Sequence, residues 1–180
     1  LRSNNDFELE GSRADKDRIE IYSDSDHAGD RPYTTKSQTG TIIMLNGVPV
    51  HWSSKNQVTQ TAYSSAVAEI YALSETIRAG RLYNWRCEEM HMNVTWPMVV
   101  QVDNQQAISF QQGTCVQSKI RGVVDMRDQW VQELKDMNVV VTEKVKGTMN
   151  PANILTKSLP NWKFKNELDM INDKQRQHRI

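Results

Sequence analysis

Three carboxylates and one amide stand where the hydrophobic pattern predicts the ends or the beginnings of regular elements. Asp24 follows a strand-like run, Glu69 lies early in a predicted helix, Asp103 ends the apolar run 98–102, and Asn153 opens a short helical segment. Carboxylate oxygens are the ligands that Mg²⁺ prefers. Two such ions about 3.5–4 Å apart stabilise the attacking and leaving oxygens of an in-line phosphodiester displacement. If the fold brings these residues together, the pattern favours metal-assisted phosphodiester hydrolysis.

Each of these residues also has an ordinary structural explanation. An aspartate after a strand is usually a turn former or a helix cap, and a helical glutamate is most often solvated. Ligand sites in open α/β sheets lie beyond the carboxyl ends of strands. Asp103 fits that position, and Asp24 lies beside it if the two strands are neighbours. The chemical interpretation therefore depends on the residues being taken together.

The elements that must position these residues follow from periodicity and turn signals. Residues 18–23 alternate polar and apolar, which is typical of a half-buried strand. Asn46-Gly47 separates two strand-like runs, 41–45 and 48–53, and predicts a hairpin. A helix follows from Ser64, with Gly80 as a possible break. Strands are predicted at 98–102 and 139–145, and helices at 105–111, 123–137 and 152–159. This order predicts an α/β fold with a mixed sheet and helices on its faces.

The length and composition fit one domain with polar ends. The 180 residues suffice for one hydrophobic core. Residues 18–160 are predicted to form the domain, with 1–17 as a linker from an upstream domain and 161–180 as a helical, weakly anchored tail. Cys87 and Cys115 lack metal-ligand spacing. No apolar run is long enough to span a membrane, so we expect an intracellular protein without a membrane partner.

The charge balance gives no support to nucleic-acid binding by itself. Lys plus Arg number 22 and Asp plus Glu number 22, so the formal net charge is zero. Nucleic-acid-binding domains usually carry an excess of positive charge. Such a function therefore requires basic residues to cluster on one face around the acidic site.

Five ordered sequence blocks nevertheless point to one family. The first is Tyr-Ser-Asp-Ser-Asp-His-Ala-Gly-Asp at 22–30. It is similar to the Y-S-D-A-D-W-A-G-D opening of the RNase H domain of copia-type LTR-retrotransposon polyproteins. The others resemble, in order, the family's W-S-S-K-K-Q, S-S-T-E-A-E-Y-x-A-L, C-D-N-Q-S-A-I and A-D-I-F-T-K-P-L blocks. They lie at 52–57, 64–73, 102–108 and 152–159. Five blocks in the same order are far more specific than any one motif.

The resemblance implies a fold, a reaction and roles for single residues. The fold is a five-stranded mixed sheet, with an antiparallel hairpin, parallel strands and helices on both faces. The reaction is hydrolysis of the RNA strand of an RNA–DNA hybrid with two Mg²⁺, for which Mn²⁺ can substitute. Asp24 takes the position of the aspartate shared by both metals, Glu69 that of the glutamate near the leaving group, and Asp103 that of the strand-end aspartate. Asp26 is the alternative to Asp24 on the same strand.

The same resemblance implies partners and a cellular setting. An upstream reverse transcriptase domain of the same polyprotein is expected, in a cytoplasmic particle or in the nucleus. Candidates for contacts to the hybrid are drawn from the loops and element ends near the acids, whereas Trp52, Trp85 and Trp130 are interpreted as core. The candidate contact residues are Ser53, Ser54, Lys55, Ser65, Asn104, Gln105, Lys119 and Arg121.

The sequence departs from the family pattern at Asn153, where the family has a fourth catalytic acid, an aspartate. Loss of one charge about 4 Å from a divalent ion costs several kcal/mol at an effective dielectric near 20. We therefore expect weakened or abolished catalysis with substrate binding retained. Asp26, Asp30 and Glu143 are the acids considered as substitutes. The asparagine has three explanations: a deliberate inactivation, a lesion in a decaying element, or a natural variant.

Two other functions remain open at this point. One is a catalytically inactive RNase H-like module that binds nucleic acid or a polymerase or other protein partner. The other is an integrase or transposase core of the same fold, which the position of Glu69 in the first long helix disfavours. Cleavage of an RNA–DNA hybrid discriminates between the enzyme and the inactive module.

Overall fold

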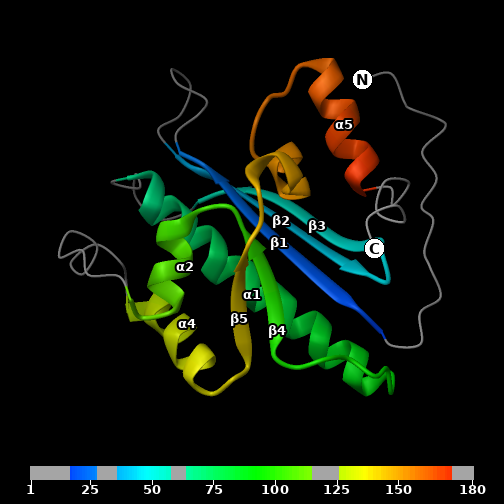
Figure 1. The fold of residues 1–180 in the computed structure, drawn as a ribbon, viewed down its shortest axis with the longest axis vertical. Helices are drawn as coiled ribbons and strands as arrows, with labels where there is room; N and C mark the ends of the chain where they lie inside the picture. Colours follow the sequence, from blue (N-terminus) through cyan, green and yellow to red (C-terminus); the bar gives the residue numbers. More distant parts are fainter. Residues whose placement is uncertain (1–16, 28–35, 58–63, 115–125, 172–180) are drawn as a thin grey trace.

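A single mixed sheet of five strands forms the centre of the computed structural model, which describes residues 17–27, 36–57, 64–114 and 126–171. The strand order is β3-β2-β1-β4-β5 (Figure 1). The strands are β1 (Ile19–Asp26), β2 (Gln38–Leu45), β3 (Val48–Asn56), β4 (Met98–Val102) and β5 (Val140–Lys144).

The first three strands are antiparallel and the last two pairings are parallel, as predicted for a mixed sheet. Asn46 and Gly47 form the β2–β3 turn with φ of 51° and 83°. These left-handed conformations are those for which Asn-Gly is selected in two-residue hairpins. The hairpin prediction is confirmed, and both of its strands extend three residues further than expected from hydrophobicity.

Strand β1 also continues past its predicted end at Ser23, so Asp24 lies within the strand and not after it. Asp24 pairs opposite Gly40, and Asp26 opposite Gln38. Gly40 has no room for a side chain, because a Cβ there would lie 2.7 Å from the Ala152 carbonyl oxygen. A search for alternating apolar residues does not detect this end of the strand, because its residues are polar. It is buried because other chain segments cover it.

Three helices cover one face of the sheet: α1 (Ser65–Glu89), α2 (Gln105–Gln111) and α4 (Met126–Asp136). The main core between them and the sheet includes Ile21, Leu73 and Val100. Helix α1 continues through Gly80, so the possible break at this glycine does not occur. A Cβ at Gly80 would lie 2.7 Å from Ile21 Cδ1 and 2.9 Å from Met98 Sδ, so the glycine permits close helix–sheet packing.

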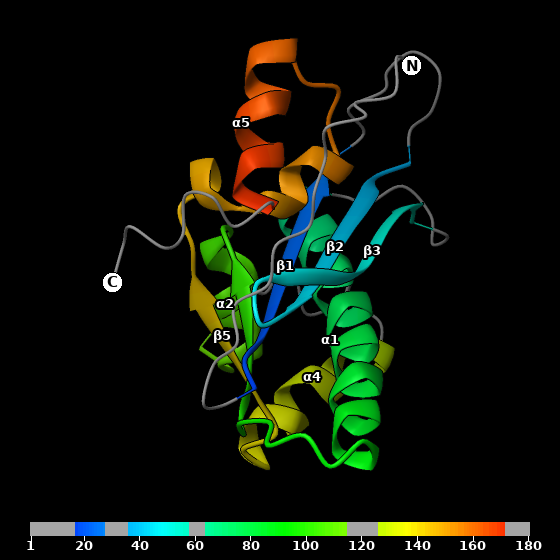
Figure 2. The same cartoon turned by 90° about the vertical axis from the view of Figure 1, so that its right-hand side faces the viewer.

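The opposite face is covered near its upper end by two short 3₁₀ turns and a helix (Figure 2). These are η1 (Gly147–Met149), η2 (Pro151–Leu155) and α5 (Asn161–Ile171). The predicted helix 152–159 is thus a 3₁₀ turn that ends at Leu155, where Thr156 N donates to Asn153 O in the three-residue pattern. Ile171 is buried with Tyr22, Ile42 and Ala152 in a second core, so α5 packs on the domain.

The interpretation of all three tryptophans as core was wrong for two of them. Trp52 is 63% exposed on edge strand β3, and Trp85 is 55% exposed on α1. Trp130 packs against the main core, and its Nε1 donates to Ser74 Oγ at 3.2 Å. Among the described residues, no helix combines the length and apolar character that crossing a membrane requires.

Candidate metal centre

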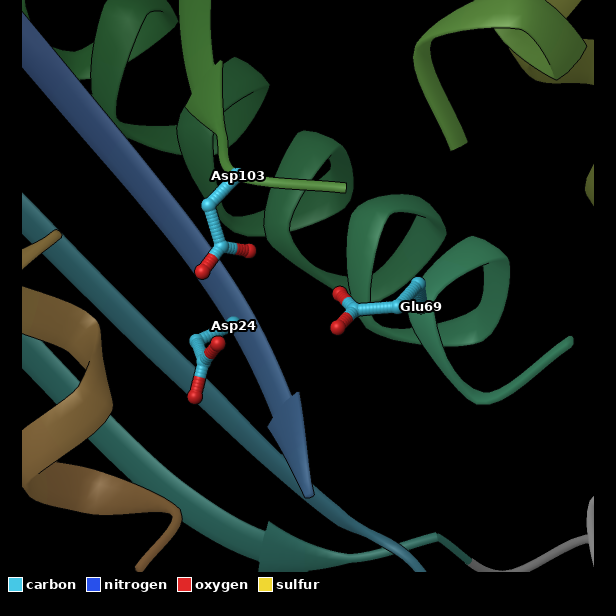
Figure 3. A group of neighbouring side chains, drawn as sticks. All are labelled: Asp24, Glu69 and Asp103. Carbon is cyan, nitrogen blue, oxygen red and sulfur yellow. The ribbon is translucent and has the colours of Figure 1, made fainter. Parts of the chain in front are cut away.

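Asp24, Glu69 and Asp103 converge at one end of the sheet. One carboxylate oxygen of each lies within 4.8 Å of one of each of the others. Figure 3 shows the three side chains directed toward a common space between β1, the end of β4 and α1. The parallel pairing of Ser23 with Val102 places Asp24 and Asp103 at the same level of neighbouring strands. The geometric expectation from the sequence is therefore confirmed for these three acids.

The position of Glu69 depends on how α1 is fixed to the sheet. Ser64 caps the helix by accepting a hydrogen bond from Val67 N at 3.3 Å, as predicted for this serine. Two turns after Glu69, Thr76 Oγ1 lies 2.7 Å from Thr41 Oγ1 and donates to Ser23 Oγ at 3.1 Å. These buried bonds set the rotation of α1, and so Glu69 faces Asp24.

The cluster is buried and electrostatically unfavourable without a cation. Asp24 is 1% exposed and Glu69 is 7% exposed. Burial raises the pKa of Asp24 to about 6, although the Lys157 ammonium group opposes this rise. Burial, and then the negative charges of Asp24 and Asp103, raise the pKa of Glu69 to about 8. Within the part of the chain that the structure describes, Glu69 Oε2 has no hydrogen-bond partner. Such a donor set fits hard divalent cations, which prefer carboxylate oxygens.

Two residues that the sequence analysis did not single out contact Asp24. Thr156 Oγ1 donates a hydrogen bond to Asp24 Oδ2, and Lys157 Nζ lies 3.6 Å from the same oxygen. Both follow η2, within the last of the five sequence blocks. That block was the available signal for them, because local periodicity says nothing about contacts with a strand 130 residues away.

Gly147 links Asn153 to this cluster. Its Nδ2 donates to the Gly147 carbonyl oxygen, and a Cβ on Gly147 would lie 3.0 Å from Asp103 Oδ2. Asn153 is 5% exposed, and its buried Oδ1 finds no hydrogen-bond partner in the segments that the structure describes. An unpaired buried acceptor of this kind is costly unless it meets a donor or a cation.

Of the acids considered as substitutes for the missing charge, the two that the structure describes are not part of the cluster. Asp26 and Glu143 lie outside the group of acids that the described residues bring together. Glu143 Oε2 instead accepts a hydrogen bond from Gln101 Nε2 at 3.0 Å. Asp30 lies outside the described residues.

The predicted hybrid-contact residues have different surroundings. Lys55, Ser65 and Gln105 are exposed, and Ser53 is half-buried. Ser54 Oγ donates to Leu155 O at 2.6 Å and accepts from Gln38 Nε2, so its hydroxyl ties β3 to η2. Asn104 caps α2 through its side-chain oxygen. Lys119 and Arg121 lie outside the described residues.

Comparison with known proteins relates this fold to a sequence family. No protein-family model matches the sequence. The chain is 32% identical, over 146 residues and 79% of its length, to the retrovirus-related Pol polyprotein from transposon TNT 1-94 of Nicotiana tabacum. Its fold is similar to that of LC11-RNase H1, whose structure was solved in complex with an RNA/DNA hybrid. The TM-score is 0.53 at 21% identity, and the match covers 77% of this chain and 94% of that one. The chain has an RNase H-like fold and is similar in sequence to one part of a retrotransposon Pol polyprotein.

Two further comparisons agree with this assignment or extend it. The N-terminal RNase H domain of rv2228c from Mycobacterium tuberculosis matches with a TM-score of 0.50 and 14% identity, over 84% of this chain and 96% of that one. Secreted RxLR effector protein 161 of Plasmopara viticola is 43% identical over 75 residues, which are 42% of this chain and 51% of the effector. The RNase H-like domain spans about a tenth of the Pol polyprotein and about half of the effector.

The buried acids of this RNase H-like domain predict how its stability changes with pH. Because folding raises the pKa of Asp24 to about 6 and that of Glu69 to about 8, the folded state favours the protonated forms. Their contribution is fully present below the unfolded pKa values and is lost as pH rises through the folded ones. Without metal, the free energy of unfolding is therefore expected to fall by about 5 kcal/mol between pH 5 and pH 8.5, most of it from Glu69.

Urea unfolding in the presence of EDTA measures this fall, and Glu69→Gln is the comparison variant. The neutral amide removes the group that titrates highest, so the variant is expected to lose the upper half of the pH dependence. Divalent metal added at pH 8.5 is expected to restore stability to the unmodified domain. A wild-type stability that rises across this pH range would contradict the account.

Proposed function

We propose that this domain hydrolyses the RNA strand of RNA–DNA hybrids with the help of two divalent cations, Mg²⁺ or Mn²⁺. The observation that carries the proposal is the convergence of Asp24, Glu69 and Asp103 within an RNase H-like fold. LC11-RNase H1, a structure of the same fold, is described in complex with an RNA/DNA hybrid. Water adds across the P–O3′ bond, so the products carry 5′-phosphate and 3′-hydroxyl ends.

The three acids divide the work of holding the cations. Asp24 has the central position, since it lies beside Asp103 on the sheet and faces Glu69 on α1. We assign Asp24 to both ions, Glu69 to the ion near the leaving group, and Asp103 to the strand side of the centre. When bound, the cations would activate water and stabilise the leaving oxygen. The chain's contribution is a buried, preorganised set of negative charges.

Residues around the acids keep that set in place. Thr156 donates to Asp24 Oδ2, which leaves the other oxygen of this carboxylate available. Gly147 allows the chain to pass close to Asp103, where a side chain would press on the carboxylate. Asn153 occupies the fourth position with a neutral amide. Its uncharged Oδ1 provides a weaker ligand than a carboxylate, so we propose slow hydrolysis with substrate binding retained.

Recognition of the hybrid is proposed for exposed residues around the centre. Lys55 at the end of β3 can contact a phosphate, and Ser65 and Gln105 at the starts of two helices can contact sugars or phosphates. The RNA strand is distinguished by its 2′-hydroxyl groups. Lys119 and Arg121 complete the proposed phosphate contacts. We also propose an upstream reverse transcriptase domain as the covalent neighbour, in an intracellular retrotransposon particle.

The neutral side chain of Asn153 favours a second candidate function, a hybrid-binding module without catalysis. In that case the acidic cluster still binds cations and the hybrid still binds, but no RNA product forms. The two functions share the fold and the metal centre and differ only in the chemical step.

Cleavage of an end-labelled RNA strand tests the proposal. The labelled RNA is annealed to DNA and incubated with the domain and Mg²⁺ or Mn²⁺, and the same RNA paired to RNA serves as the control duplex. We expect slow, metal-dependent cleavage of the hybrid alone, abolished by EDTA. Hybrid binding without any product would favour the second candidate, and failure to bind metal would refute both.

A further inference from the structure

Glu167 on α5 is a buried carboxylate without a hydrogen-bond partner. It lies one turn before Ile171 and is 2% exposed. Neither Oε1 nor Oε2 has a hydrogen-bond partner among the described residues, and the ammonium of Lys163 approaches only to 4.0 Å. A buried charge costs several kcal/mol unless it is well paired. The structure thus buries an acid that Lys163 reaches only at the limit of ion-pair distance, which leaves it able to accept a further donor.

The surroundings of Glu167 connect it to the metal centre. Helix α5 packs against η2 (Figure 2), and Lys157 lies two residues after the end of η2. Burial raises the pKa of Glu167, the ammonium groups of Lys163 and Lys157 lower it, and the negative charge of Asp24 raises it further. Glu167 and Asp24 therefore both lie within electrostatic range of Lys157.

A divalent cation bound by Asp24 would compete with Lys157 for this carboxylate. The lysine ammonium lies 3.6 Å from Asp24 Oδ2 and carries a charge of the same sign as the cation. At such distances two like charges repel by several kcal/mol at an effective dielectric near 20. The Lys157 side chain is 40% exposed. Its flexible stem lets the ammonium group move while the backbone stays in place.

We propose that Glu167 is a positioning residue that accepts the Lys157 ammonium group when a divalent cation occupies the Asp24–Glu69–Asp103 centre. In the metal-free domain Lys157 neutralises Asp24. On metal binding it moves to Glu167, which pairs the buried carboxylate and removes a competing charge from the centre. Helix α5 thereby becomes part of the functional site. This inference rests on the proposed function, in which Asp24, Glu69 and Asp103 hold divalent cations.

Calorimetric titration with Mn²⁺ tests the role of Glu167 without a cleavage assay. Glu167→Gln is expected to weaken Mn²⁺ binding by about tenfold, the size of one charge-assisted hydrogen bond. Asp169→Asn is the matched control, because it removes the same charge from an exposed position of α5. It is expected to leave the affinity unchanged. Equal affinities of Glu167→Gln and the unmodified domain would overturn the inference.

A double-mutant cycle with Lys157→Gln separates this mechanism from a direct charge effect. Lys157→Gln alone is expected to bind Mn²⁺ more tightly, since the competing ammonium group is gone. In that background Glu167→Gln is expected to have no further effect, because it has no lysine to accept. A tenfold loss that persists there would overturn the lysine transfer.

Two measurements keep these outcomes interpretable. Thermal melting without metal checks that each variant folds; if Glu167→Gln does not, Glu167→Leu repeats the titration with an uncharged side chain of similar size. If the unmodified domain itself fails to bind Mn²⁺, the metal centre is refuted together with this inference. If it binds and the cycle shows no coupling, only the inference fails.

Discussion

Replacing Asn153 by aspartate is expected to raise the rate of hybrid cleavage by about 100-fold. The amide donates to Gly147, which lies close to the Asp103 carboxylate, and the amide oxygen is buried without a hydrogen-bond partner among the described residues. A full charge about 4 Å from a divalent ion contributes about 4 kcal/mol at an effective dielectric near 20. Even about two-thirds of that energy, realised in the transition state, gives a 100-fold rate increase. Single-turnover cleavage of the labelled hybrid measures it.

Asn161→Asp is the control for this substitution, because it makes the same chemical change at an exposed residue near the start of α5. Its cleavage rate is expected to stay at that of the unmodified domain. Without metal, the Asn153→Asp variant is expected to be less stable at pH 8.5, since it buries a further negative charge near Asp103. A variant that binds Mn²⁺ and hybrid but cleaves no faster would show that position 153 does not act on the chemical step.

The parts of the fold that follow from local chemistry were predicted from the sequence. Asn46-Gly47 needs left-handed backbone conformations and selects a two-residue hairpin, which the structure shows. The apolar run before Asp103 predicts a buried strand, and the parallel pairing of β1 with β4 then brings Asp24 beside it. Local patterns thus tied each acid to a predicted element, whereas the convergence of the three acids was an expectation from the five ordered blocks and the RNase H family that they resemble.

The surroundings of the cluster depend on packing between distant segments and were not predicted. Glu167 has the sequence context of an ordinary helical glutamate, and only the packing of α5 against η2 buries it. Lys157 looks like a solvated lysine until η2 places it next to Asp24. Gly80 and Trp85 show the same limit on α1. The packing of the sheet against the helix requires the glycine, and the tryptophan is largely exposed.

The residues around η2 place neutralising contacts around the Asp24 carboxylate. Asp24 receives a hydroxyl from Thr156 and a positive charge from Lys157, both of which arrive from the chain segment after η2. Gly147, in the segment before η2, lies close to the Asp103 carboxylate. The 3₁₀ region thus supplies the neutralising contacts of the centre, whereas the sheet and α1 supply its negative charge. Asn153 lies within that region and adds no charge of either sign.

Asp24→Asn is expected to abolish both Mn²⁺ binding and cleavage while stabilising the metal-free domain. The substitution removes the acid assigned to both cations, and loss of about 4 kcal/mol corresponds to a rate reduction on the order of 1000-fold. The buried amide still accepts from Thr156, and it no longer has a charge to desolvate. Since burial is the main cause of the raised pKa of Asp24, the gain in stability should be largest above pH 6.

Asp26→Asn distinguishes the two aspartates of β1, because it makes the same change two residues along the same strand. Asp26 is half-buried and lies outside the acidic cluster. We expect this variant to keep Mn²⁺ binding, cleavage and the pH dependence of stability of the unmodified domain. Comparison of the two variants by calorimetry, single-turnover cleavage and urea unfolding thus locates the shared ligand. The proposed centre depends on Asp24 facing both Glu69 and Asp103. If Asp26→Asn loses metal binding and Asp24→Asn does not, the assignment of Asp24 as the shared ligand is wrong.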